Sequence, residues 1–203
     1  MQTTKIPDQA MFTDLNPGHS PWRERLDALL NVGVKAGADL VEVFLERTDH
    51  LGVLAEQDRI TSVSPAFGMG AGIRVFRNGR DGFVSTNDLS DPGLTAALHQ
   101  ALGMLQLDVS TLMDHSGFEG LGSLRDYGDD KNGWLAATPD LDTITHRLLE
   151  GTLSLQKRGQ HLEVRRGSFS RDWQEVLVAA SDGTFARDIR CLLYTSDAAD
   201  DSY

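Results

Sequence analysis

The sequence predicts an α+β fold, with antiparallel meander sheets packed with helices in two successive helix-then-sheet units, the second incomplete. Apolar residues recur at helical spacing over residues 20–36, 91–106 and 139–158, and each of these segments begins near a proline. The segments that follow change to a period of two, which is typical of strands. The order of helix and then strands therefore occurs twice, although no sequence identity proves a repeat.

The first unit opens with a helix for which Ser20 is the predicted N-cap and Pro21 the first helical residue. Gly37 offers its C-terminal stop. Alternating apolar residues then predict antiparallel strands between residues 40 and 87. One turn is expected at Gln57 and Asp58, and a type I′ turn at Asn78-Gly79, a dipeptide that tolerates positive φ at both positions. The predicted strands are short: 41–45, 51–56, 59–64, 73–77 and 82–86.

The second unit follows a Gly/Asp-rich stretch that is too long for an ordinary connection inside one domain. Before it, Asp91-Pro92 is expected to cap the helix 91–106, and after it Thr138-Pro139 opens the helix 139–158. A second sheet is predicted to begin after that helix, with strands 162–171, 174–180 and 185–190 and a turn at residues 181–183.

These features divide the chain into five predicted parts. They are a flexible leader (1–19), an N-terminal α+β domain (20–106), a Gly/Asp-rich linker (107–138), the truncated start of a central domain (139–190) and a foreign tail (191–203).

The tail reads CLLYTSDAADDSY and abandons the preceding pattern. Suitable codons for its first six residues resemble the mosaic end used in transposase-based sequencing libraries, so we interpret residues 191–203 as translated sequencing adapter and exclude them from fold reasoning. A natural acidic tail is the alternative. We expect the last strand to end at Arg190 and the tail to add no packed element.

Composition excludes several classes of function. The net charge of -11 argues against a nucleic-acid surface, because such affinity depends on Lys and Arg neutralising phosphates. The sequence has no apolar signal core and no run long enough to span a bilayer, so no membrane partner and a cytoplasmic location are expected. Cys191 is the only cysteine, which excludes a disulfide framework or a Cys-based zinc site.

No constellation in the chain predicts catalysis. None of the six histidines lies in an H-E-x-x-H or H-E-x-x-x-H string, and the His146–Glu150 pair alone is short of the three protein ligands of catalytic zinc. The glycine-rich string at residues 68–72 precedes a strand and not a helix, so a nucleotide loop is rejected. We expect no catalytic and no metal residues, and the substrate-binding residues stay unknown.

Two blocks of the sequence resemble the TldD/PmbA family, also called modulators of DNA gyrase. Residues 38–90 contain the motifs DRI, GAGIRV and GFVSTNDLS in family order, and EVLVAASDGTFARDIR at 175–190 resembles the start of the next family domain. We assign a structural role to the family-motif residues Asp58, Arg59, Ile60, Gly70, Gly72, Arg74, Gly82, Asp88, Asp182 and Gly183.

The resemblance implies a cytosolic zinc metallopeptidase subunit that acts on peptides or unfolded segments and forms a heterodimer with a PmbA-type partner. The family's zinc helix, H-E-x-x-x-H, is expected beyond Arg190, so no metal ligand is carried over to these residues, and zinc is expected only in the full-length protein. A non-enzymatic binding module and the inactive PmbA-type subunit remain alternatives, although the wording LVAASDGT favours the TldD type. We also expect an unpaired strand edge at residues 185–190.

Overall fold

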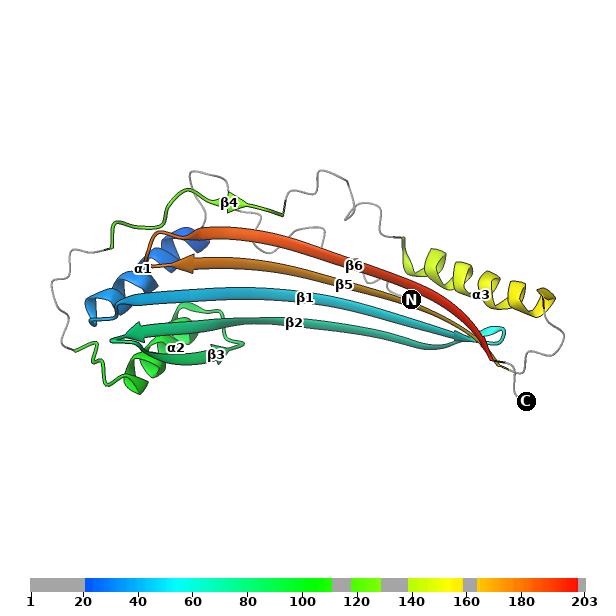
Figure 1. Cartoon of the computed structure of the whole chain (residues 1–203), viewed down its shortest axis with the longest axis horizontal. Coiled ribbons are helices and arrows are strands. Elements are labelled where there is room, and N and C mark those ends of the chain that lie inside the picture. Colours follow the sequence, from blue (N-terminus) through cyan, green and yellow to red (C-terminus); the bar gives the residue numbers. More distant parts are fainter. Residues whose placement is uncertain (1–20, 111–117, 129–138, 159–163, 201–203) are drawn as a thin grey trace. The chain divides into compact units, whose positions relative to one another are not determined.

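The computed structural model of the chain describes residues 21–110, 118–128, 139–158 and 164–200 (Figure 1). Three helices and six strands lie within these residues, so the predicted α+β class is confirmed. The described residues form two compact units. The first comprises residues 21–47, 69–110, 118–128 and 175–188, and the second comprises residues 48–68, 139–158, 164–174 and 189–200.

The strands form one sheet in the order β3-β2-β1-β5-β6-β4. Their bounds are β1 Leu40–Glu56, β2 Arg59–Arg77, β3 Arg80–Thr86, β4 Arg125–Asp126, β5 Val164–Ala180 and β6 Phe185–Asp200. The prediction of a second, separate sheet is therefore wrong. β1 pairs with β2 on one side and with β5 on the other, so both of its edges have a neighbouring strand. The sheet is also mixed, because β2 and β3 are antiparallel whereas β4 and β6 are parallel.

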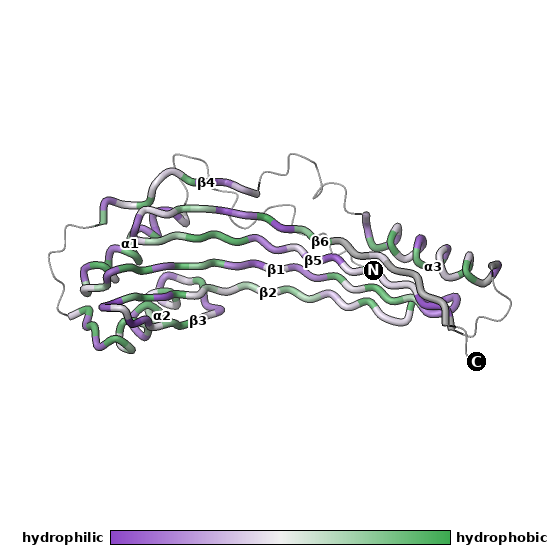
Figure 2. Tube along the Cα trace, viewed as in Figure 1, coloured by the Kyte–Doolittle hydropathy of each residue, from purple (hydrophilic) through white to green (hydrophobic). Residues whose placement is uncertain are grey.

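The strands are longer than predicted. β1 spans residues assigned to two short strands, and β2 and β5 do the same. Figure 2 shows hydrophilic residues interrupting the hydrophobic stretches within these long strands. Such residues break the apolar alternation, but the backbone of a strand continues to pair with its neighbours whatever its side chains are.

The predicted end of the last strand at Arg190 is also wrong, because β6 continues to Asp200. The tail residues Cys191, Leu192 and Thr195 lie within this strand, and the side chain of Leu192 is exposed. Extension needs only backbone pairing with β5, the next strand in the sheet, so it requires no packed side chains.

The core of the first unit lies between the sheet and the two helices α1 (Pro21–Lys35) and α2 (Asp91–Met104). Odd-numbered residues of β1 face this core, which explains why Val41, Val43 and Leu45 are fully buried. Gly37 ends α1 as predicted, with φ of 96° and its N–H bonded to the carbonyl of Val34. Ser20, the predicted cap, lies outside the described residues.

The second unit has its own core under α3 (Leu141–Arg158). Its buried members are Val53, Ala55, Ile144, Leu148 and Phe169. The helix begins two residues later than the predicted Thr138-Pro139 opening suggests. Asp140 caps it, since its carboxylate accepts the Thr143 N–H at 2.6 Å. Thr138 lies outside the described residues.

Both predicted hairpin turns of the first half are present. Asn78 and Gly79 have φ of 51° and 72°, as a type I′ turn requires, and Gln57 has φ of 59°. In the part of the chain that the structure describes, no helix is long and apolar enough to cross a bilayer.

Candidate functional site

The family-motif residues do not converge on one point of the fold. Asp58 and Arg59 are exposed at the β1–β2 turn, and Ile60 packs against the core of the second unit. Arg74 lies exposed on β2, 3.6 Å from Asp81 and with its guanidinium 5.5 Å from the centroid of the Phe83 ring. These positions shape the ends and one face of β2, and they bring together no set of acid, base and nucleophile.

The motif glycines lie where another group comes very close. A Cβ at Gly82 would stand 2.5 Å from the carbonyl oxygen of Ala101, so this glycine lets β3 approach α2. A Cβ at Gly72 would stand 3.0 Å from the Phe83 ring. At Gly70 it would lie 3.1 Å from the Thr86 carbonyl oxygen. The string at residues 68–72 therefore lies inside a strand, where it provides clearance.

Asp88 organises the start of α2. Its carboxylate accepts the Ser90 N–H at 3.0 Å, while the Ser90 hydroxyl accepts the Gly93 N–H at 3.2 Å. Ser90 is thus the N-cap, one residue before the predicted Asp91. The hydrogen bonds from the Ser90 side chain and backbone hold the pKa of Asp88 below its usual value.

Asp182 and Gly183 form the predicted turn between β5 and β6. The Asp182 carboxylate accepts the Thr184 N–H at 2.9 Å, and hydrogen bonding with Thr184 lowers the pKa of Asp182. Gly183 has φ of 92°, and its carbonyl accepts the Gly122 N–H at 2.8 Å. The turn therefore also holds a segment that precedes it by about sixty residues of chain.

That segment, residues 118–128, is held against α1 within the first unit. The guanidinium of Arg23 donates to the carbonyls of Leu121 and Gly122, and the Asp27 carboxylate accepts the Leu121 N–H at 2.8 Å. The segment then forms β4, which pairs in parallel with Ala186 and Arg187 of β6. The predicted unpaired edge at residues 185–190 is therefore wrong at these two residues.

Sequence reasoning missed a buried charge network under this segment. Glu175 is completely buried, and one of its carboxylate oxygens accepts Nε and Nη2 of Arg187 at 2.9 and 2.8 Å. Arg187 Nη1 also donates to Asp126 at 3.0 Å. A signal was present in the sequence, because Glu175 precedes the buried Leu177 by two residues on the same strand face. The network ties β4, β5 and β6 together.

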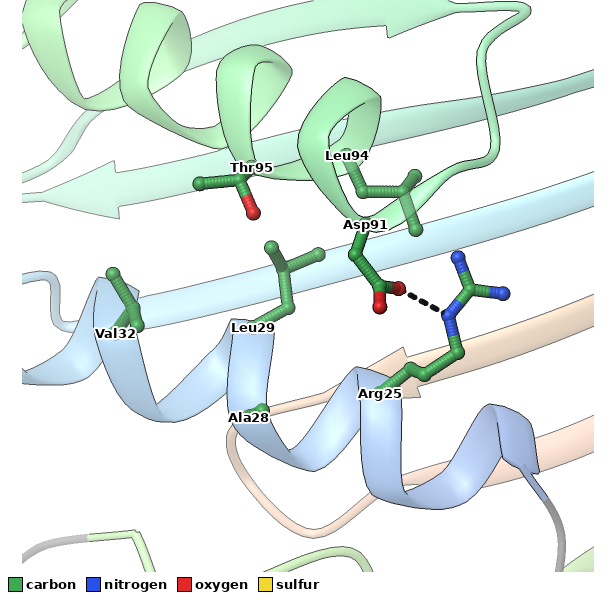
Figure 3. A pocket seen from close by; sticks show the side chains of 7 residues that line it. All are labelled: Arg25, Ala28, Leu29, Val32, Asp91, Leu94 and Thr95. Atoms are coloured by element: carbon green, nitrogen blue, oxygen red, sulfur yellow. Dashed lines mark hydrogen bonds and ion pairs between the residues drawn. The ribbon is translucent and has the colours of Figure 1, made fainter.

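A small pocket of about 220 Å³ lies between α1 and α2 (Figure 3). Its lining is Arg25, Ala28, Leu29, Val32, Asp91, Leu94 and Thr95. Arg25 Nε donates to Asp91 at 2.5 Å, and Arg25 lies over the Trp22 ring. Since cofactor pockets usually exceed about 300 Å³, this one fits a single apolar side chain better than a cofactor.

The described histidines are separate from one another. His146 and Glu150 form an exposed i,i+4 pair at 3.2 Å on α3, while His50 Nδ1 lies 2.6 Å from Asp172. His99 is exposed on α2. His19, His115 and His161 lie outside the described residues, as do Asp129 and Asp130. Among the described residues, no group of three or more His, Cys, Asp or Glu side chains could hold a metal ion, so these residues do not fit the zinc that the resemblance implies.

Three comparisons place this fold among known proteins. Residues 41–105 match the family model for PmbA/TldA metallopeptidase domain 1. No curated protein sequence matches the chain. In structure the chain resembles TldE from Thermococcus kodakarensis, with a TM-score of 0.62 and 19% identity over 87% of this chain and 39% of that one.

Two further crystal structures have the same fold, and both proteins are provisionally described as modulators of DNA gyrase. The one from Thermotoga maritima has a TM-score of 0.65 and 14% identity over 90% of this chain and 41% of that one. The one from Bacteroides thetaiotaomicron has a TM-score of 0.60 and 15% identity over 89% of this chain and 41% of that one. The chain thus spans about two fifths of the length of these proteins.

The α+β scaffold of this chain is similar to that of three solved proteins described as TldE or as gyrase modulators. Residues 41–105 are in addition similar to the first domain of the PmbA/TldA metallopeptidases, so both comparisons support a likeness to the TldD/PmbA family.

Proposed function

We propose that this chain provides the N-terminal part of a TldD-like zinc metallopeptidase subunit that cleaves peptides or unfolded segments in the cytoplasm. The observation that carries the proposal is the match of residues 41–105 to the first domain of a metallopeptidase family. The described residues supply scaffold and surfaces, because their motif side chains are engaged in turns, caps and packing. Zinc and the catalytic glutamate would come from sequence beyond Arg190, and the partner would be a PmbA-type subunit in a heterodimer.

A second candidate is a non-enzymatic member of the family, either an inactive PmbA-type subunit or a binding module that acts on gyrase. The likeness to TldE and to two proteins described as gyrase modulators favours this alternative. At 14–19% identity these likenesses concern the fold, so the choice depends on the chemistry of the longer protein.

The decisive experiment starts from the gene. Its reading frame is followed past codon 190, and the longer protein is produced with and without a PmbA-type partner. We expect an H-E-x-x-x-H string, about one zinc per subunit, and cleavage of unfolded casein that a chelator abolishes. A longer protein that lacks this string, or that has it but leaves unfolded casein intact with zinc and partner present, would contradict the proposal.

The chain of 203 residues provides the matching control. We expect it to bind no stoichiometric zinc and to cleave nothing, because a catalytic site needs about three protein ligands and an open water position. Tight zinc binding with chelator-sensitive turnover by this chain alone would place the catalytic centre within it and refute our assignment.

A further inference from the structure

A serine, a histidine and an aspartate from three neighbouring strands come together in the second unit. Ser64 belongs to β2, His50 to β1 and Asp172 to β5, and these strands are adjacent in the order β2-β1-β5. His50 Nδ1 lies 2.6 Å from Asp172 Oδ1, although 122 positions separate the two residues along the chain. Spacing in the sequence therefore gives no sign of this arrangement.

The Asp172 carboxylate fixes the orientation of the His50 imidazole. Nδ1 of the neutral ring donates its proton to Oδ1, which leaves the lone pair on Nε2. The second carboxylate oxygen is held as well, because the Ser170 hydroxyl donates to Oδ2 at 3.3 Å. A histidine held in this tautomer offers a base at Nε2 that can accept a proton from a nearby hydroxyl.

Gly52 lets Nε2 and Ser64 face the same gap. A Cβ at Gly52 would stand 3.3 Å from His50 Nε2 and 3.8 Å from Ser64 Cβ, so the imidazole extends over this glycine toward β2. Glycine weakens a strand, and in a strand interior it often marks a site of close approach. The Ser64 hydroxyl lies 3.0 Å from that of Ser62, which can donate to it and leave the Ser64 proton available to Nε2.

The arrangement is open to small molecules from solvent. The side chains of His50 and Asp172 are 40% and 52% exposed, and Ser62 and Ser64 are both exposed. A surface ion pair between β1 and β5 would require neither a glycine under the imidazole nor hydroxyl groups beside it. The combination of acid, base and hydroxyl is instead the one that activates a serine as a nucleophile.

We propose that Ser64 is a nucleophilic modification site that accepts an acyl group from activated donors, such as aryl esters and acyl phosphates. His50 Nε2 takes the Ser64 proton as Oγ bonds to the carbonyl carbon of the donor. The bond from that carbon to the leaving oxygen then breaks, and the leaving group takes the proton from Nε2. Asp172 is a positioning residue that acts through His50.

The exposure of the site determines the class of donor and the end of the reaction. Solvent weakens the hydrogen bonds that stabilise a developing oxyanion, so the donor must carry a good leaving group. The acyl-serine persists, because a serine alkoxide leaves far less readily than a phenolate or a phosphate. One equivalent therefore reacts without turnover. The reaction uses neither zinc nor any residue beyond Arg190, so it is independent of the proposed peptidase activity.

The test treats the whole chain with p-nitrophenyl acetate in the presence of a chelator and locates acetyl groups by peptide mass mapping. We expect one acetyl group on Ser64 and a single burst of nitrophenolate. Ser154 is the internal control, because it is exposed in the same unit and its hydroxyl donates to the Gly151 carbonyl at 2.7 Å. Acetylation of Ser64 no faster than that of Ser154 would overturn the proposal.

Two histidine variants separate a general base from a surface effect. His50→Gln should slow acetylation of Ser64 at least about tenfold, as loss of a general base requires. His146→Gln is the matched control, since His146 also faces a carboxylate, that of Glu150 at 3.2 Å, in the same unit. It should leave the rate unchanged. A parental rate in His50→Gln, or equal slowing by both variants, would contradict the role of His50.

Asp172→Asn tests the positioning role. It should slow acetylation and shift the His50 tautomer away from the form protonated at Nδ1, which the side-chain nitrogen chemical shifts report in NMR. A merely structural role of Asp172 would leave the tautomer as it is. An unchanged tautomer in this variant would therefore also overturn the proposal.

Discussion

Gly82 gives the sharpest test of how β3 and α2 are held together. The Cβ of an alanine at this buried position would lie 2.5 Å from the carbonyl oxygen of Ala101 and 3.1 Å from Cβ of Met104. Merely reaching 3.0 Å from that oxygen requires α2 or β3 to move by about 0.5 Å, and close-packed interiors resist such shifts. We expect Gly82→Ala to lower the free energy of unfolding by about 1–3 kcal/mol, the usual cost of overpacking.

Gly103, which lies on α2 itself, is the matched control. A Cβ there meets nothing within 4 Å, so Gly103→Ala should raise stability by about 0.5–1 kcal/mol through helix propensity alone. Urea unfolding gives the global change, and hydrogen exchange of the α2 amides shows whether the loss is local to that helix. A Gly82→Ala protein as stable as the parent, with unchanged α2 exchange, would refute the reasoning from close approach.

The remaining predictions concern the charge network around Glu175, the N-cap of α2 and Pro65 of β2. Arg187→Met removes the guanidinium that donates two hydrogen bonds to the fully buried Glu175 and should cost about 3–5 kcal/mol in urea unfolding, much of it recovered when Glu175→Leu is added. Ser90→Ala removes the α2 cap and should cost about 1 kcal/mol, seen as faster exchange of the first-turn amides. The pKa of Asp88 is lowered in the folded state, so its stabilising effect is present above the usual value of 3.8 and is lost as pH falls through the lower folded pKa. Asp88→Asn should therefore flatten the dependence of stability on pH below pH 3.8. An unchanged dependence in that range would contradict this. Pro65 lies on β2 before the pairing with β3 begins at Ala71, so Pro65→Thr restores a backbone N–H there and should increase self-association in light scattering. An unchanged scattering profile would show that the proline does not protect this strand.

Local sequence patterns predicted the helices and turns, but they did not predict which strands pair with each other across long stretches of the chain. Asn78 and Gly79 determine their hairpin because positive φ at two neighbouring residues is a local requirement. The placement of β5 beside β1 has no such signal, since it brings Ser181 to within a hydrogen bond of Val41 across 140 residues of chain. The alternation of apolar residues shows that a strand exists and which face is buried, but it does not identify the neighbouring strand.

The buried charges were missed for a related reason. Charged residues are almost never fully buried unless they are paired, so Glu175 was read only as part of a motif. Its partner Arg187 lies twelve residues away across the β5–β6 turn, and Asp126 comes from the segment that we had interpreted as linker. The period of two along the strand places Glu175 on the same buried face as Leu177. A buried carboxylate requires a cation nearby, and the next strand is where that cation is to be sought.

Two sites of the first unit show why the motif residues of a chain need not lie on its binding surface. At one edge, the turn glycine Gly183 and Arg187 hold residues 118–128 against β6, so a recognisable motif serves to close that edge. On β3, Gly82 lets α2 lie close against the core-facing side of the strand. Both signatures mark places where the scaffold is closed. A surface that must remain free to bind a varied main chain imposes few demands on side-chain identity, and strand addition is an interaction of that kind. The motif residues of this chain therefore mark its scaffold, and their positions do not by themselves identify a binding surface.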